Sequence, residues 1–228
     1  MNIKNILIVE GEQDKRFFDK FIASVNPSLS RKVEVKVATS KDLDSNGTNT
    51  QQGVLRTLGT LSKQLDDGTY HRLGMIIDMD YIQQGKVPIQ KRTFEQVCNV
   101  LDSADFKTES IAFENEGTFF SNPDFSNPIG VWVMPNNSDE GYLEVWIERI
   151  MSSECTDHYE AVKIFVNSFD ENHFKGHNLT KARIYTWLAT QPKPAQDSCI
   201  CLNSNLNLID INSPFYQNFK AWLIATFN

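Results

Sequence analysis

Four acidic residues follow two short apolar runs and could together hold a metal ion. Glu10 ends the run IKNILIV, and Asp14 follows four residues later. Asp78 and Asp80 end a second run, LGMIIDMD. Residues two apart on a strand point to the same side, so Asp78 and Asp80 can share one cation. Carboxylate oxygens with no nearby His or Cys favour Mg²⁺ or Mn²⁺ over zinc.

Three of these four acids also have a simpler structural interpretation. Asp14 would stabilise the dipole of a helix that begins near it, and Asp78 or Asp80 could cap a turn. Glu10 has no equally good structural role, because a carboxylate at the end of a buried strand needs a partner or a metal. Four carboxylates at two strand ends repel one another unless divalent cations neutralise them.

The two apolar runs, residues 3–9 and 73–80, are typical of parallel strands buried on both faces. Alternation over residues 33–39 and the apolar run 130–135 predict two further strands. Apolar residues at helical spacing follow Asp14, and the same spacing predicts helices from Val54 to Leu65 and from Thr93 to Ala104. Strands that alternate with helices indicate an α/β fold with a mainly parallel sheet, in which ligands bind at the carboxyl ends of the strands.

The remainder of the chain changes to helical patterns. LEVWIERIM, YEAVKIFVNSF and LTKARIYTWLA each carry one, CICL at 199–202 suggests a last strand with Cys199 and Cys201 on one face, and Pro214 starts a terminal helix. We therefore expect an α/β core over residues 1–140 and a mostly helical extension, 141–228, packed on it. IAF at 111–113 suggests one more short strand.

The acidic motifs resemble a known signature. Val9 to Asp14 followed by Ile77 to Asp80 resembles the toprim pattern, a Glu after the first strand and an Asp-x-Asp after the third, found in topoisomerases, primases and overcoming-lysogenization-defect nucleases. Asp14, in an ExxxD spacing, looks most like the nuclease branch. GVWVMPNN (130–137), GYLE (141–144) and KARIYTWLA (181–189) are similar to an uncharacterised toprim-like family, the DUF3226 group.

The resemblance spans nearly the whole chain and implies a toprim-like, Rossmann-like fold with a metal site. It also implies nuclease activity as a hypothesis. The chain departs from the expected pattern at one place, because Asn136 stands where we expect an Asp between Pro135 and Asn137. If that Asp is a ligand in relatives, this chain lacks one charge there.

Other polar residues are weaker candidates. Glu144 starts a helix and could contact a metal or a metal-bound group, or could be an exposed first-turn acid. Lys181 and Arg183 could reach a phosphate, although a solvated charged face is the commoner role. His173 and His177 have a zinc-like spacing, but the surrounding polar residues favour a surface loop. The four tryptophans are expected to be core residues.

Charge limits the choice of partners. The net charge of -7 repels phosphate backbones, but residues 1–74 hold eleven basic and nine acidic residues, so an anionic partner should meet the first third. The apolar runs are too short for a signal peptide or a membrane span, and the four cysteines form no CxxC pair. These features favour a cytoplasmic location with reduced thiols and no membrane partner.

The leading hypothesis is a Mg²⁺- or Mn²⁺-dependent enzyme that cleaves phosphodiesters or transfers phosphoryl groups on nucleic acid. Glu10, Asp14, Asp78 and Asp80 would hold the metal, and Glu10 could instead act as a general acid or base. The alternatives are a non-enzymatic toprim-fold module of a larger assembly, as a homo-oligomer or with a protein partner, and a phosphohydrolase of a small phosphorylated molecule.

Overall fold

The computed structural model describes residues 4–38, 50–66, 68, 70–79, 92–108, 116–169, 176–194 and 197–228. In this part of the chain a five-stranded sheet has the order β2-β1-β3-β5-β4. The strands are β1 (Lys4–Val9), β2 (Val33–Val37), β3 (Tyr70–Asp78), β4 (Thr118–Phe120) and β5 (Ile129–Met134). β2, β1, β3 and β5 are parallel, and β4 pairs antiparallel with β5 at one edge. The predicted α/β class with a mainly parallel sheet is confirmed.

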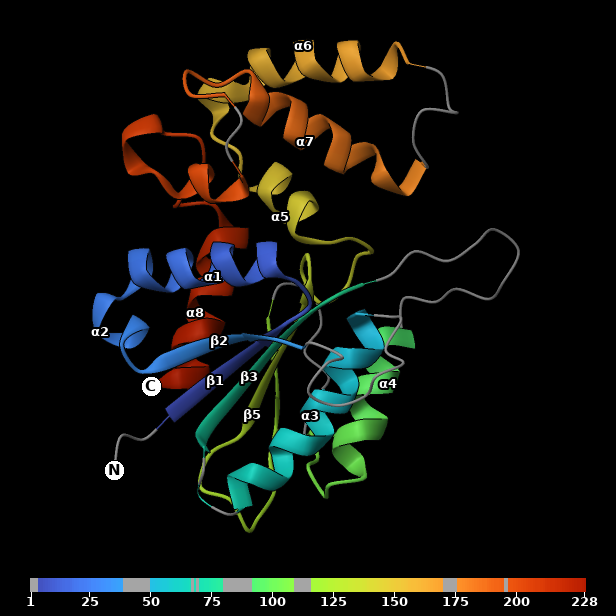
Figure 1. Cartoon of the computed structure of the whole chain (residues 1–228), viewed down its shortest axis with the longest axis vertical. Helices are drawn as coiled ribbons and strands as arrows, with labels where there is room; N and C mark the ends of the chain where they lie inside the picture. Colours follow the sequence, from blue (N-terminus) through green and yellow to red (C-terminus); the bar gives the residue numbers. More distant parts are fainter. Residues whose placement is uncertain are drawn as a thin grey trace.

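Helices cover both faces of this sheet (Figure 1). One face carries α3 (Thr50–Asp66) and α4 (Arg92–Asp102), and the other carries α1 (Glu12–Val25) and α8 (Pro214–Phe227), with α2 (Pro27–Ser30) following α1. Side chains alternate along each strand, so β1 sends Leu7 and Val9 to one core and Ile6 and Ile8 to the other. Both faces of β1 are therefore buried, as its continuous apolar run predicts.

The segments that follow β5 form a group of helices, which lies above α1 in the view of Figure 1. It consists of α5 (Leu143–Arg149), α6 (Thr156–Asn167), α7 (Leu179–Ala189) and four short 3-10 turns, η2 (Ser153–Cys155), η3 (Gly176–Asn178), η4 (Ser198–Leu202) and η5 (Ser204–Leu206). The chain then returns to the sheet, where α8 packs on β3 and β5. The expected role of the tryptophans is confirmed, because Trp132, Trp146, Trp187 and Trp222 are all buried.

Two local predictions need correction. CICL at 199–202 belongs to the 3-10 turn η4 and not to a strand, because the Asp197 carboxylate accepts a hydrogen bond from the Cys199 N–H at 3.0 Å and starts the turn. Cys199 and Cys201 are nevertheless both buried. The antiparallel β4 was not predicted, since three residues are too few to show a period. The strand expected at 111–113 lies outside the described residues.

None of the described helices combines the length and the apolar composition needed to cross a membrane.

Close approach of α8 to the sheet depends on glycines. A Cβ atom added at Gly130 of β5 would lie 2.8 Å from Cγ2 of Thr226, which is buried in α8. Gly74 of β3 has the same role, because an added Cβ would lie 2.7 Å from Cζ of Phe227. The C-terminal helix can therefore sit on the sheet only where these side chains are missing.

Replacing Gly130 with Ala should lower the free energy of unfolding by about 1–3 kcal/mol, the usual cost of overpacking a core. Gly59→Ala is the matched control. Gly59 lies inside α3, and an added Cβ would lie at an ordinary contact distance of 3.5 Å from Cγ1 of Val100 on α4. That control should raise stability by about 0.5–1 kcal/mol, since alanine is the better helix residue. Urea unfolding measures both changes, and equal effects of the two substitutions would contradict the packing described for α8.

Candidate metal centre

Glu10 and Asp78 meet at the carboxyl ends of two neighbouring strands. Glu10 follows the last residue of β1, and Asp78 is the last residue of β3. The Asp78 N–H donates a hydrogen bond to Glu10 Oε1 at 2.8 Å. Glu10 and Asp78 therefore lie at one edge of the sheet, while Asp80, the third acid expected to converge there, lies outside the described residues.

The end of β3 is also hydrogen-bonded on the side of β5. The Met79 N–H lies 3.2 Å from the Met134 carbonyl oxygen and 3.0 Å from that of Gly141, and the Gly141 N–H donates back to Met79 at 3.0 Å. Gly141 has a φ of 150°, in the region that favours glycine. This pairing fixes the backbone next to Asp78 against the loop that follows β5.

Asp14 lies in the first turn of α1, whose N-cap is Gly11. The pKa of Asp14 is raised to about 6, mainly by burial and then by the negative charge of Glu144. A hydrogen bond from the Gly11 backbone and the positive charge of Lys181 lower it in part. The Asp14 carboxyl group therefore holds its proton more tightly than an exposed aspartate.

Asp78 is subject to the same two effects, burial and nearby negative charge. Burial raises the pKa of Asp78 well above its usual value, and the charges of Glu10 and Asp14 add to the effect. Lys181 opposes it, while Glu144 adds to it more weakly. Among the described residues, the carboxylates of Glu10, Asp14, Asp78 and Glu144 share this edge of the sheet with the Lys181 ammonium group. A divalent cation would neutralise the excess negative charge.

Glu144 is buried, which corrects the interpretation of an exposed first-turn acid. It retains only 5% of its surface in the first turn of α5. The Tyr185 hydroxyl donates a hydrogen bond to Glu144 Oε1 at 2.9 Å, and Lys181 Nζ lies 4.0 Å from Glu144 Oε2. No motif in the sequence singled out Tyr185, although its spacing of four residues from Lys181 puts both on one face of α7.

The remaining candidates lie apart or outside the description. The Arg183 Nη2 donates to Asn167 Oδ1 at 2.8 Å and so joins α7 to α6. Asp80, His173 and the His177 side chain lie outside the described residues.

Asn136 organises the loop at the position where we expected an Asp. It is buried, and its Oδ1 accepts hydrogen bonds from the backbone N–H groups of Ser138 at 3.4 Å and Asp139 at 2.9 Å. Its Nδ2 donates to the Asp139 carboxylate at 3.0 Å, which in turn pairs with Arg149 of α5 at 2.7 Å. Donation to Asp139 requires the amide and not a second carboxylate.

The donor chemistry of this edge suits Mg²⁺ or Mn²⁺, since the carboxylates are hard oxygen ligands. Within the described ranges, no three His, Cys, Asp or Glu side chains approach closely enough to hold one ion together. Mg²⁺ is commonly bound by one or two carboxylates, with waters and substrate phosphates completing its shell. Glu10 and Asp78 therefore fit an incomplete, substrate-facing metal site better than a closed structural one.

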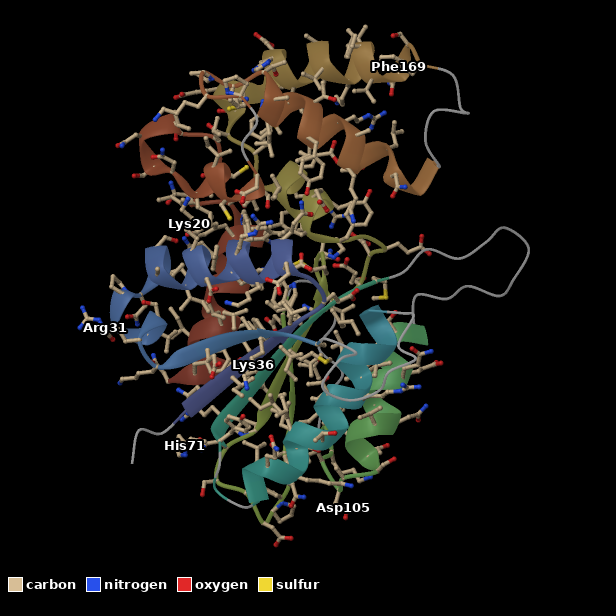
Figure 2. All side chains as sticks on the ribbon, viewed as in Figure 1. Lys20, Arg31, Lys36, His71, Asp105 and Phe169 are labelled. Carbon is tan, nitrogen blue, oxygen red and sulfur yellow. The ribbon has the colours of Figure 1, made fainter. Side chains whose placement is uncertain are left out.

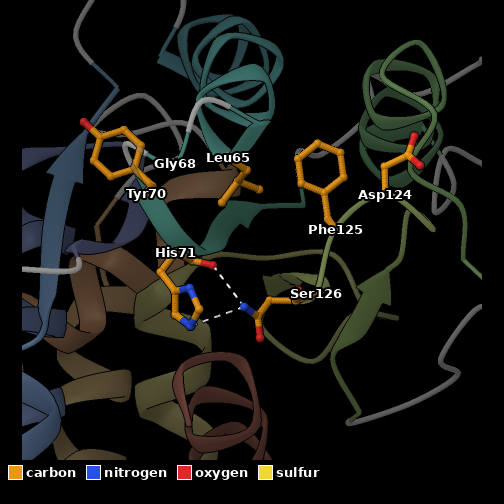
Figure 3. A pocket seen from close by; sticks show the side chains of 8 residues that line it. Leu65, Gly68, Tyr70, His71, Asp124, Phe125 and Ser126 are labelled. Atoms are coloured by element: carbon orange, nitrogen blue, oxygen red, sulfur yellow. Dashed lines mark hydrogen bonds between the residues drawn. The ribbon is translucent and has the colours of Figure 1, made fainter.

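A shallow pocket of about 260 Å³ lies away from the acids, at the amino end of β3 (Figure 3). It is lined by Leu65, Gly68, Tyr70, His71, Asp124, Phe125, Ser126 and Asn127. The Asn127 Nδ2 donates to the His71 carbonyl oxygen at 3.3 Å. Because Asp78 ends the same strand, this pocket and the acidic edge are at opposite ends of the sheet.

Comparison with known proteins gives one match. The model of a family described as a protein of unknown function, DUF3226, matches residues 4–228. The chain belongs to the DUF3226 family. Neither the curated proteins nor the solved structures contain a match. The similarity noted at Gly130–Asn137, Gly141–Glu144 and Lys181–Ala189 is thereby confirmed at the level of the family.

In metal-free buffer, Asp14→Asn should stabilise the protein at pH 8 by an amount on the order of 1 kcal/mol. A carboxyl group with a raised native pKa loses its proton first in the unfolded chain. Stability therefore falls as the pH rises from about 4 to about 6, the native pKa of Asp14, and the penalty persists above that pH. The variant lacks this penalty, so its advantage should vanish as the pH falls toward 4.

Urea unfolding with a chelator at several pH values measures this difference. The control is Asp19→Asn on the same helix, where the carboxylate is exposed and pairs with Lys15 at 2.6 Å. It should bring no gain at pH 8. A destabilised Asp14→Asn at pH 8 would show that the carboxylate has a structural role instead.

Proposed function

We propose that this protein is a Mg²⁺- or Mn²⁺-dependent enzyme that cleaves phosphodiesters or transfers phosphoryl groups on nucleic acid. The observation that carries the proposal is the contact between Glu10 Oε1 and the Asp78 N–H at 2.8 Å, at the carboxyl ends of adjacent parallel strands. Ligands of open α/β sheets bind at such ends. The order of the acidic motifs along the chain supports a relationship to toprim nucleases.

Glu10 and Asp78 would hold the metal, with waters and substrate oxygens completing its shell, and we expect Asp80 to contribute because it lies two residues beyond the end of β3. When bound, the ion would neutralise the scissile phosphate and lower the pKa of an attacking water. Buried carboxylates in excess of nearby positive charge are the appropriate ligands for that cation.

The chain itself supplies groups for proton transfer and for binding phosphate. Asp14 has a pKa of about 6, so near neutral pH its carboxyl group can take up or release a proton, and Glu10 is the alternative acid or base. Lys181 Nζ lies 4.6 Å from the centre of the Tyr142 ring and close to Glu144. From there its ammonium group can contact an oxygen of a phosphate that is bound at the acidic edge.

Basic side chains of the first third support a nucleic-acid substrate. Lys20 of α1, Arg31 at the end of α2 and Lys36 of the edge strand β2 are spread over the side of the molecule that these three elements form (Figure 2). Their charges can approach a phosphate backbone despite the acidic remainder of the chain.

The net charge of -7 favours a second candidate, hydrolysis of a small phosphorylated molecule. A compact substrate needs no extended basic surface, since the metal itself would bind its phosphate. The two candidates share the metal site and differ only in which substrate is turned over.

Cleavage of single- and double-stranded DNA, of RNA and of a small phosphomonoester should be compared with Mg²⁺, with Mn²⁺ and with a chelator. We expect metal-dependent cleavage that falls at least about 100-fold in Glu10→Gln and in Asp78→Asn, as for loss of a group that stabilises charge in the transition state. Glu34→Gln, an exposed acid on β2, is the control and should be unchanged.

Turnover of the phosphomonoester alone would favour the second candidate. Metal binding without cleavage of any of these substrates would contradict both, and would favour a toprim-fold module that acts within a larger assembly.

A further inference from the structure

Tyr185 joins three elements at the acidic edge. It lies on α7, and its hydroxyl is 2.9 Å from Glu144 Oε1 on α5 and 3.1 Å from Gln13 Oε1 on α1. Glu144 and Gln13 belong to segments more than a hundred residues apart in the chain. One phenol group therefore connects the first turn of α1, next to Asp14, with the helices of the C-terminal segment.

The chemistry of the three groups gives this connection a direction. A phenol has a single O–H, which goes to the stronger acceptor, the Glu144 carboxylate. The amide oxygen and nitrogen of Gln13 exchange places with a simple flip, which lets its N–H donate to the phenol oxygen. The hydrogen bonds then run from Gln13 to Tyr185 and from Tyr185 to Glu144.

The second oxygen of Glu144 faces Lys181, one helical turn before Tyr185. Lys181 Nζ is 4.0 Å from Glu144 Oε2 and 4.6 Å from the centre of the Tyr142 ring. The Lys181 side chain is 42% exposed, whereas that of Glu144 is 6% exposed. A buried carboxylate fixed at one oxygen can thus anchor an ammonium group that is itself open to solvent.

We propose that Tyr185 is a positioning residue, which orients Glu144 so that this carboxylate holds the Lys181 ammonium at the acidic edge. In this arrangement Glu144 aligns the lysine and is not a metal ligand, and α7 is a functional part of the site. The role of the aligned lysine toward phosphate rests on the proposed function, whereas the alignment itself does not.

Tyr159 offers a matched control, because it also donates to a carboxylate of α5. Its hydroxyl donates to Glu148 Oε1 at 2.8 Å, so it links α6 to α5 one turn after Glu144. Tyr159→Phe removes the same kind of bond, from a phenol to a carboxylate of α5, at a place away from Lys181. A general loss of stability in α5 would therefore appear in both variants.

The position of Lys181 can be read from the full-length protein after its lysines have been dimethylated with a ¹³C label, which keeps their positive charge. The methyl signal of Lys181 should be shifted upfield by the Tyr142 ring beneath it, and its absence in Lys181→Arg assigns it. In Tyr185→Phe we expect this upfield shift to be lost, with the signal moving to the position of exposed lysines. In Tyr159→Phe the signal should stay where it is.

An unchanged Lys181 signal in a folded Tyr185→Phe would overturn the positioning role. Where Tyr185→Phe does not fold, Glu144→Gln replaces it, because it removes the charge that holds the lysine while keeping an acceptor for Tyr185. That variant should also lose the upfield shift, and retention of the shift would overturn the proposal.

Activity separates this proposal from the proposed function. In an active enzyme, Tyr185→Phe should lower kcat about 10-fold or more and leave Mn²⁺ affinity within about threefold, since Glu10, Asp14 and Asp78 are untouched. If the wild type cleaves none of the substrates and the upfield shift of Lys181 is nevertheless lost in Tyr185→Phe, the positioning role stands and the proposed function is contradicted. An active Tyr185→Phe with wild-type kcat would overturn a part for Tyr185 in that function.

Discussion

The Glu10 carboxylate accepts a hydrogen bond from the Asp78 backbone N–H, and this contact holds its negative charge at a partly buried position. Parallel pairing of β1 with β3 brings the two strand ends together, and α1 and α5 then add Asp14 and Glu144. The raised pKa values of Asp14 and Asp78 express the resulting repulsion and loss of hydration. A fold with such an edge accepts a loss of stability that a bound cation would relieve.

The C-terminal helices complete this edge in two ways. Helix α8 lies on β3 and β5 over glycine positions and so supports the strand that ends in Asp78. Helix α7 carries Lys181 and Tyr185 to Glu144 and so brings an ammonium group close to these acids. The site therefore depends on packing between the sheet and the last third of the chain.

The sequence was sufficient for the parts of the fold that rest on local patterns. Continuous apolar runs located β1, β3 and β5, and helical spacing located the long helices, because buried strands and amphipathic helices each leave a period. Glu10 and Asp78 could be paired from the sequence because the carboxyl ends of neighbouring parallel strands share one edge. The proposed division at residue 140 stays a prediction.

Features that depend on tertiary contacts could not be predicted in this way. The burial of Glu144 follows from the docking of α7, and no pattern around residue 144 shows it. The turn at Cys199 is set by one side-chain hydrogen bond from Asp197, which overrides the strand-like alternation of CICL. The short β4 is held by its pairing with β5 and by little in its own three residues.

The most direct measurement is the free energy of unfolding of the wild-type protein at pH 8 as a function of Mg²⁺ or Mn²⁺ concentration. A cation that binds only the folded acidic edge raises stability by about 1.4 kcal/mol for each tenfold increase in concentration above its dissociation constant. The account predicts this increase for the wild type and its loss in Asp78→Asn. Equal stability of the wild type with the cation and with a chelator would contradict the claim that the carboxylates form a metal centre.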